Sequence, residues 1–347
     1  MLVADLILIN FAEILLMKKI GLVTLSFGFI FFFGSWGFLV HRTVNQLAVY
    51  QLPKQMRPFF FKNMDYIVKH SIRPDQRRNQ DSTEAPKHFI DLEAFGDSAA
   101  WRMPLIWTEA VNQFSKDSLI KYGYVPYWIV NVKEKLTKAF RNGNKGSILF
   151  YAADLGHYIG DANVPLHTSL NYDGQLTGQR GLHSLWESFI PEIELSQYQL
   201  YNGHRAKYLE QPEIAIWEAI RRAHLLLNDV LEKEREVTKQ FTDSTKYRIQ
   251  KRNGRDVRYY TAAFAKAYAA TLAPTINNQL LHSSNLMADF WYTSWVDAGK
   301  PDFKNLLDNS FTMADKKKLK AEHKAYKKGK LLEQNLLIAK RDTVAEN

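Results

Sequence analysis

Two pairs of histidine and carboxylate residues stand at helical spacing in the middle of this chain. His157 precedes Asp161 by four residues, His183 precedes Glu187 by the same spacing, and His167 lies between the two pairs. Residues at i and i+4 lie on one face of an α-helix, so each pair can direct two side chains to one place. Imidazole and carboxylate groups are ligands that Zn²⁺ accepts. The spacing predicts a metal site built on helices, since chance placement of surface residues explains one such pair more easily than two.

Composition limits how such a site can be built. The chain has 347 residues, of which 46% are hydrophobic and none is cysteine. That length suffices for one large domain or two smaller ones with a sizeable core. The lack of cysteine excludes disulfides, thiolate metal sites and cysteine nucleophiles, so any metal must rest on His, Asp and Glu.

The net charge of +10 first suggests a nucleic-acid-binding protein. However, nine Lys and one Arg stand against three acidic residues between Thr312 and Arg341, which places +7 of the excess there. The rest of the chain is close to balanced and gives little support to a long nucleic-acid groove. We expect residues 311–347 to be a Lys-rich tail, either a solvated helix or disordered, rather than a contact for nucleic acid or anionic lipid.

The first 35 residues are nearly all apolar. A charged start at Met17 followed by an apolar stretch to Phe33 is typical of a secretory signal, and Met17 is itself a candidate true start. We predict a signal peptide over residues 1–35, with cleavage after Ser35 giving a secreted or periplasmic protein. An uncleaved segment would instead anchor the chain, since about 20 apolar residues can span a bilayer.

Apolar residues recur at helical spacing along most of the remaining chain. Segments 70–79 and 171–181 are predicted loops, the second because it is rich in Gly, Asn and Asp. No alternating strand pattern, internal repeat or phosphate-binding glycine loop is evident. The predicted fold is all-α, a multi-helix bundle whose metal ligands project inward. The predicted helices cover 36–52, 55–72, 104–121, 126–141, 145–160, 181–189, 213–239 and 259–295, the last interrupted at Pro274.

These features resemble the superfamily that joins bacterial zinc-dependent phospholipases C with the secreted single-strand-specific zinc nucleases of fungi and plants. The resemblance covers most of residues 36–308 and is dense only at the motifs. His157, Asp161 and His167 match the central H-x3-D-x5-H spacing, and His183 with Glu187 matches the closing pair.

Four residues nearer the N-terminus complete the resemblance. Trp36 and His41 look like the family's N-terminal Trp and first His, while Asp75 and His88 look like its isolated Asp and the His that follows. Asp65 and Asp81 remain available in place of Asp75. The resemblance implies a helical domain with three Zn²⁺ ions. The first would be held by Asp75, His88, His157 and Asp161, the second by His167, His183 and Glu187, and the third by the amine and carbonyl of Trp36 with His41, with Asp161 bridging it to the first.

The activity implied by this resemblance is zinc-dependent phosphodiester hydrolysis. Two zinc ions roughly 3.5–4 Å apart can share and deprotonate a water near neutral pH and stabilise the attacking and leaving oxygens. Asp161 would bridge two ions, and the resemblance suggests that Asp75 orients the water or accepts its proton. Asp91 and Asp154 are candidates for fixing an imidazole tautomer, with ordinary surface salt bridges as the alternative.

Two substrate classes remain open, and we favour the first. Glu187 as the last ligand, the lack of cysteine and the short loop between His167 and His183 favour a phospholipase C-like enzyme acting on phospholipids. The spacing from Trp36 to His41 looks more like the nucleases, in which aromatic side chains stack the bases of single-stranded DNA or RNA. A metal-binding protein without turnover is a third interpretation. We expect a monomer with no obligate protein partner.

Overall fold

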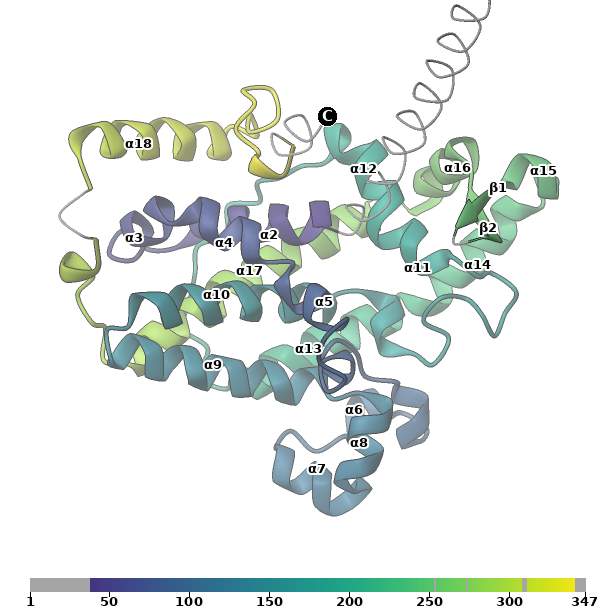
Figure 1. The fold of residues 1–347 in the computed structure, drawn as a ribbon, viewed down its shortest axis with the longest axis horizontal. Helices are drawn as coiled ribbons and strands as arrows, with labels where there is room; N and C mark the ends of the chain where they lie inside the picture. Colours follow the sequence, from purple (N-terminus) through teal and green to yellow (C-terminus); the bar gives the residue numbers. More distant parts are fainter. Residues whose placement is uncertain (1–37, 253, 273, 308–310, 341–347) are drawn as a thin grey trace, which may run out of the picture. The chain divides into compact units, whose positions relative to one another are not determined.

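The computed structural model describes residues 38–340 apart from positions 253, 273 and 308–310 (Figure 1). The predicted signal segment and Trp36 therefore lie outside the described residues. Within the described ranges the chain is mostly helical, which confirms the predicted fold class. No helix in these ranges has the length and apolarity needed to cross a membrane.

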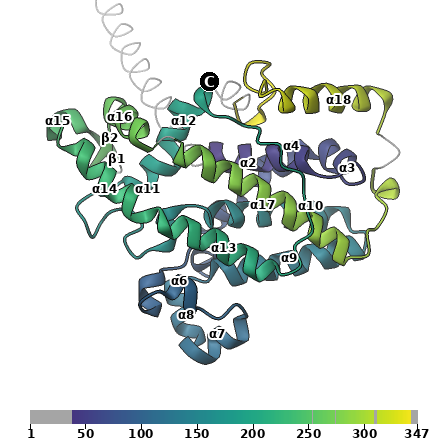
Figure 2. The ribbon, with the colours of Figure 1, turned by 180° about the vertical axis from the view of Figure 1, so that it is seen from behind.

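Four long helices form the centre of the described part. α2 (Phe38–Gln51), α10 (Lys145–Asp161) and α17 (Thr275–Asp297) contact one another, and α9 (Val125–Arg141) packs against α10 and α17. From the opposite side, Figure 2 shows α17 beside α13 (Pro212–Leu225). α2, α9 and α10 lie close to the bounds that the apolar spacing predicts, because each has an apolar face to bury.

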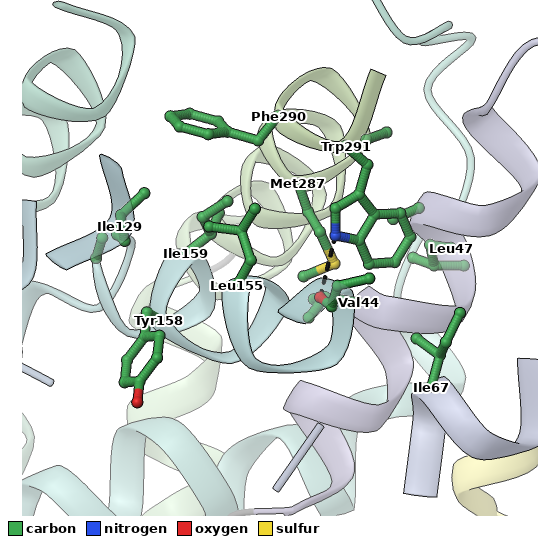
Figure 3. Packing of buried hydrophobic residues seen from close by; sticks show 14 of the residues in the cluster. Val44, Leu47, Ile67, Ile129, Leu155, Tyr158, Ile159, Met287, Phe290 and Trp291 are labelled. Atoms are coloured by element: carbon green, nitrogen blue, oxygen red, sulfur yellow. Dashed lines mark hydrogen bonds between the residues drawn. The ribbon is translucent and has the colours of Figure 1, made fainter. Parts of the chain in front are cut away.

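The faces that these helices share form the larger hydrophobic core (Figure 3). Val44 of α2, Leu155 of α10 and Phe290 of α17 are fully buried there. Trp291 is also buried, and its indole Nε1 donates a hydrogen bond of 3.0 Å to the carbonyl of Ala152. Burial of apolar surface contributes about 25 cal/mol per Å². This core holds α2 and α10 in the fixed relation on which the site below depends.

Shorter helices complete the fold. A second hydrophobic cluster joins α12, α14 and α16 to the segment that follows α10. The α-helices are α3 (Arg57–Lys62), α4 (Met64–His70), α5 (Arg73–Arg77), α6 (Ala99–Arg102), α7 (Trp107–Phe114), α8 (Lys116–Tyr122), α11 (Leu182–Ser184), α12 (Ile190–Glu194), α14 (Leu227–Thr238), α15 (Asp243–Lys246), α16 (Ala262–Leu272) and α18 (Met313–Lys327). Short 3-10 turns are η2 (Ala85–Lys87), η3 (Leu92–Phe95), η4 (Pro165–Thr168), η6 (Leu195–Gln197) and η7 (Lys304–Leu307), and η5 (Leu185–Phe189) is a π-helical turn.

Three predicted helices are each divided in two, at Asn63, Ser115 and Leu226. Ser115 has φ 66°, and its side chain accepts a hydrogen bond from the first turn of α8, so it ends one helix and caps the next. The predicted loop 70–79 instead contains α5. Pro74 lies in the first turn of that helix, where its missing N–H costs nothing, so proline here begins a helix rather than preventing one.

The expectation that the chain has no strands was wrong. β1 (Tyr247–Arg252) and β2 (Arg255–Tyr260) form an antiparallel hairpin. Arg252 pairs with Arg255, so the connection has two residues, and its sequence is Asn-Gly. That dipeptide favours the tight turn of a two-residue hairpin.

The Lys-rich segment forms a packed helix in its described part. α18 begins with a reciprocal capping pair between Thr312 and Asp315 and contacts α2 and α3 (Figure 1). Tyr326 on its inner face is buried, and so is Leu337 beyond it. The lysines occupy the outer face, so a single apolar stripe is enough to hold the helix in place.

Candidate metal centre

Four of the candidate ligands meet at the end of α10. His157 and Asp161 lie one turn apart on this helix, Asp75 comes from α5, and His88 directly follows η2. His88 Nδ1 lies 2.9 Å from Asp161 Oδ2 and 3.1 Å from His157 Nε2. Asp75 Oδ1 lies 3.7 Å from each of the same two ring nitrogens. Asp75, His88 and His157 form one ligand group, His41, His157 and Asp161 form another, and His157 belongs to both.

Of the three aspartates that the sequence left open, the structure brings Asp75 to this group. Asp65 is exposed on α4. Asp81 accepts hydrogen bonds from the backbone and hydroxyl of Thr83 at the surface. Neither belongs to a ligand group among the described residues. The choice depends on the position of α5, which a linear spacing does not reveal.

A second group contains His167, His183 and Glu187. His167 Nε2 lies 2.9 Å from His183 Nε2, and Glu187 Oε2 lies 2.6 Å from the latter and 3.5 Å from the former. His183 lies on α11, and Glu187 lies on the π-helical turn that continues it. Single π turns inside helices occur often at functional sites, because the wider turn changes the direction of a side chain.

His41 connects the two groups. Its Nε2 lies 3.4 Å from Asp161 Oδ1 and 3.4 Å from Glu187 Oε1. Asp161 therefore has one oxygen near the His88 side of the centre and the other near His41, as expected of a bridging ligand. Glu187 divides its oxygens in the same way between the second group and His41, which the sequence did not indicate. The ligand role of Trp36 stays a prediction.

Backbone carbonyls orient two of the imidazole rings. His157 Nδ1 donates to the carbonyl of Ser71 at 2.8 Å, and His167 Nδ1 donates to the carbonyl of His88 at 2.7 Å. In both rings this leaves the Nε2 lone pair directed into the centre, the tautomer that a metal requires.

Of the two roles that the sequence left open for Asp154, the structure shows the salt bridge and not the orientation of an imidazole. Its buried carboxylate accepts hydrogen bonds from Arg73 and forms an ion pair of 2.8 Å with Arg77. Both arginines belong to α5, on either side of Asp75. Asp154 therefore anchors the helix that presents Asp75.

Glu84 was not among the predicted site residues, and it lies beside His88 on the side away from the centre. Its side chain is buried and lies 3.6 Å from His88 Nε2 through Oε1. It also accepts hydrogen bonds from Arg77 at 3.1 Å, from Lys87 at 2.8 Å and from the hydroxyl of Tyr158. Its position four residues before His88 is the one local signal that could have identified it. The negative charge of Glu84 thus lies on the Nε2 side of His88, while Nδ1 faces the centre.

Burial and mutual charge set the protonation of the centre. Burial dominates at His157 and lowers its pKa to about 4. At His41, burial would lower the pKa, but the hydrogen bond with Glu187 and the charge of Asp161 raise it to about 9. Burial would raise the pKa of Asp161, yet the neighbouring imidazoles hold it well below the usual range. The Asp161 carboxylate is therefore ionised at neutral pH, the form that binds a cation.

Asp91 lies close to the centre without orienting a ring. It makes no hydrogen bond to a histidine in the part of the chain that the structure describes. Burial, followed by the charge of Glu93, raises the pKa of its carboxyl to about 7. Glu93 itself accepts hydrogen bonds from Ser169 and from the backbone of Leu170, and so fixes the loop that leaves His167.

The arrangement fits a metal on chemical grounds. His157 donates through Nδ1 to a carbonyl, so its Nε2 presents a lone pair toward His88 Nδ1 at 3.1 Å. The same His88 nitrogen lies 2.9 Å from Asp161 Oδ2, so imidazole and carboxylate atoms that can bind a cation converge at this point. The donor set consists of imidazole nitrogens and carboxylate oxygens, which suits borderline zinc.

Gly160 permits the close approach of α10 to His41. A Cβ atom at this position would lie 2.9 Å from His41 Nδ1. We expect Gly160→Ala to displace His41 and lower metal content, while helix propensity offsets part of the destabilisation by about 1 kcal/mol. Gly146→Ala on the same helix is the matched control, since its Cβ would meet nothing closer than 3.6 Å. Equal metal content in the two purified variants, measured by atomic absorption, would contradict this role for Gly160.

Comparisons with known proteins give a structural likeness without a sequence match. No protein-family model and no curated protein matches the chain. It resembles the alpha-toxin of Clostridium absonum with a TM-score of 0.46 and 14% identity, over 76% of this chain and 65% of the toxin. It resembles the alpha-toxin of an avian strain of Clostridium perfringens with a TM-score of 0.43 and 16% identity, over 74% of this chain and 64% of the toxin. The chain thus covers just under two thirds of the length of each toxin.

Proposed function

We propose that this chain is a zinc-dependent phosphodiester hydrolase. The observation that carries the proposal is the convergence of eight imidazole and carboxylate side chains into three groups that share members. These side chains come from positions between residues 41 and 187, so chance surface polarity does not explain their meeting. All but His183, Glu187 and Asp75 are buried, and burial of so many ionisable groups is costly without a cation.

We assign each ligand to an ion as the family resemblance implies. Asp75, His88, His157 and Asp161 would hold one ion, and His167, His183 and Glu187 a second. His41 and Asp161 would take part in holding a third, to which Trp36 can offer its amine only after removal of the preceding segment. Bound zinc would supply positive charge for the phosphoryl oxygens and acidify a water toward neutral pKa.

The chain's own carboxylates have distinct tasks in this proposal. Asp75 is 31% exposed, whereas Asp161 is 2% exposed, so Asp75 is the carboxylate of the first group that substrate and water can reach. We assign to Asp75 the orientation of the attacking water or the acceptance of its proton. Asp161 links the first group to His41, and its burial keeps its charge unscreened by solvent.

Apolar side chains beside the centre favour a phospholipid substrate. In the loop after His167, Tyr172 is 52% exposed and Leu176 is 70% exposed. The ring of Tyr172 lies 6.4 Å from that of His183. A hydrogen bond within the loop restrains it, since the Asn171 side chain accepts from the backbone N–H of Leu176. Exposed apolar groups next to a polar centre suit contact with a lipid surface, so we favour a phospholipase C-like activity.

The test is hydrolysis of phosphatidylcholine and of single-stranded DNA by the purified protein, with chelator and after re-addition of zinc. We expect release of the phosphorylated head group from the lipid, loss of this activity with chelator and recovery with zinc. Cleavage of DNA alone would establish the nuclease alternative, with Tyr172 as a stacking residue. The hydrolase proposal fails if neither substrate is cleaved in a chelator-sensitive reaction.

Variants of exposed apolar residues refine this test. We expect Leu176→Asp to reduce hydrolysis of phosphatidylcholine vesicles while sparing a short-chain soluble phospholipid, because only the vesicle requires contact with a surface. Ile249→Asp is the control, since Ile249 is 67% exposed but lies on the β1 strand. Equal losses on both substrates, or equal effects of the two variants, would contradict the assigned role of Leu176.

A further inference from the structure

A separate cavity lies at the opposite end of α2 from the metal centre. It has a volume of about 470 Å³ and is lined by the end of α2, by residues near 201–206 and by α18. Gln51 in its wall follows His41 by ten residues, which is about 15 Å along a helix. None of its lining residues belongs to the ligand groups of the metal centre.

The wall of this cavity is strongly cationic. Lys54, Arg57, Arg205 and Lys327 all line it, and they come from three parts of the chain. Among its described lining residues none is acidic. An adjoining hollow of about 370 Å³ shares Lys54 and Arg57 and extends the same charge along α18.

The nearest carboxylates are already engaged with other groups. Asp289 pairs with His204 at 2.8 Å and accepts a hydrogen bond from the backbone of Lys207. Glu322 accepts a hydrogen bond of 2.9 Å from the hydroxyl of Tyr50. Neither lines the cavity, so the positive charge there is not neutralised from within the described part of the protein.

The cations also act on one another, which shows that they lie close together. Burial, followed by the charge of Arg205, lowers the pKa of Arg57. Burial, followed by the charges of Arg57 and Lys327, lowers the pKa of His323 to about 4. A bound anion would relieve this repulsion.

Hydrogen bonds to the backbone orient the guanidinium group of Arg57. Its Nε donates to the carbonyl of Leu52 at 3.0 Å, and Nη2 donates to the same oxygen. Nη1 makes no hydrogen bond in the described part of the structure. A guanidinium fixed on one side in this way offers its other edge in a defined direction, which suits phosphate recognition.

Three tyrosine rings that pack against one another form part of the cavity wall. Tyr326 stacks on Tyr50 with ring centroids 5.1 Å apart and meets Tyr201 edge-on at 5.0 Å. The volume falls within the range of about 300–1,000 Å³ that small-molecule sites occupy. A lining of both cations and tyrosine rings matches a ligand with a charged group and a small organic part.

We propose that this cavity binds the phosphate group of a small phosphate ester, at a site distinct from the metal centre. Arg57 and Arg205 would contact the phosphate oxygens, with Lys54 and Lys327 adding charge around them. The ester is either free in solution or the head group of a phospholipid, since both present the same phosphate chemistry. The proposal does not depend on the hydrolase activity.

The test is calorimetric titration of the metal-loaded protein with sn-glycerol 3-phosphate. Arg205→Gln combined with Lys327→Gln should weaken binding by at least about tenfold, because two charge-assisted contacts are lost. Both residues are exposed and form no other hydrogen bond or ion pair in the described ranges, so folding should be unaffected. The matched control combines Lys138→Gln and Lys266→Gln, which remove the same charge from exposed positions on α9 and α16. Equal affinity in the two double variants would overturn the proposal.

Phosphate esters can also bind a metal centre, so the titration is repeated on the Asp161→Asn variant after circular dichroism confirms that it is folded. Binding that persists there and is lost on combining it with Arg205→Gln and Lys327→Gln supports a separate site. Binding that Asp161→Asn alone abolishes overturns it. Should Asp161→Asn not fold, the comparison of the two double variants decides.

The source of the phosphate is identified by co-sedimentation with phosphatidylcholine vesicles, prepared with and without phosphatidic acid. Binding that requires phosphatidic acid and is lost with Arg205→Gln and Lys327→Gln supports the cavity as a head-group site. Binding of the soluble ester alone supports it as a site for a free metabolite. Single-stranded DNA binding that these substitutions abolish, without binding of either phosphate probe, would overturn the proposal.

Discussion

Replacing Asp161 by Asn is expected to remove metal from two places at once and to lower turnover by about a thousandfold or more, equivalent to about 4 kcal/mol at 1.36 kcal/mol per decade. One carboxylate oxygen lies 2.9 Å from His88 Nδ1, and the other lies 3.4 Å from His41 Nε2. An amide keeps only one oxygen and puts an N–H donor in place of the second. It also removes the negative charge that stabilises cations on both sides.

Metal content and turnover should be measured on the same preparation of this variant. Asp65→Asn is the matched control, since it makes the same chemical change at an exposed aspartate that the sequence left open as a ligand. We expect it to retain metal and activity. A full complement of metal in Asp161→Asn, or equal losses in the two variants, would refute the bridging assignment.

Replacing Glu84 by Gln is expected to destabilise the protein by about 3 kcal/mol, within the range for breaking a buried ion pair. Glu84 is buried and accepts hydrogen bonds from Arg77, Lys87 and Tyr158. A neutral amide removes the negative charge that Glu84 pairs with Arg77 and Lys87, and leaves Arg77 only its ion pair with Asp154. Because Glu84 also faces His88, we expect metal affinity to fall by about ten- to a hundredfold, the usual cost of losing a group that orients a ligand.

The effect of Glu84 should also depend on pH. Burial would raise the pKa of Glu84, but its bonds with His88 and Lys87 hold it far below the 4.5 of a free glutamate. A depressed pKa gives stability that is fully present above pH 4.5 and is lost as the pH falls below it. Glu84→Gln should therefore flatten this acid dependence in urea unfolding.

Glu236→Gln is the control, because Glu236 is exposed on α14 and its change should stay within about 0.5 kcal/mol. Unfolding curves of Glu84→Gln that match the control at neutral pH would show that the network contributes little. Lost stability with unchanged metal affinity would limit Glu84 to a structural role.

The sequence predicts those parts of the centre whose geometry is local. His157 and Asp161 share a helix face because they are four apart, and α10 has nearly the predicted bounds. The rest depends on tertiary packing. The linear spacing does not show that Asp154 anchors α5 through its arginines. A carboxylate one turn before a histidine can contact that histidine or an arginine of another helix, and the sequence does not distinguish the two.

Two further differences have the same origin. The hairpin at 247–260 is not predicted, although its connection reads Asn-Gly, and the helix predicted from residue 259 overlaps the end of β2. In α18 the run of lysines hides an apolar stripe ending at Tyr326, whose burial depends on α2 and α3. The lysines of α18 lie on its exposed face, whereas its packing depends on the apolar residues of the buried face.

The spread of the ligands along the chain has a consequence for folding. His41 and Glu187 lie almost 150 residues apart and meet at 3.4 Å. A metal ion bound by both residues would crosslink the chain and close a long loop. The entropic cost of closing a loop rises by only about 0.6 kcal/mol for each doubling of its length. In a chain without cysteine, bound metal would thus crosslink distant segments, as disulfides do in other proteins. Metal supply would then set the lifetime of the folded chain as well as its turnover.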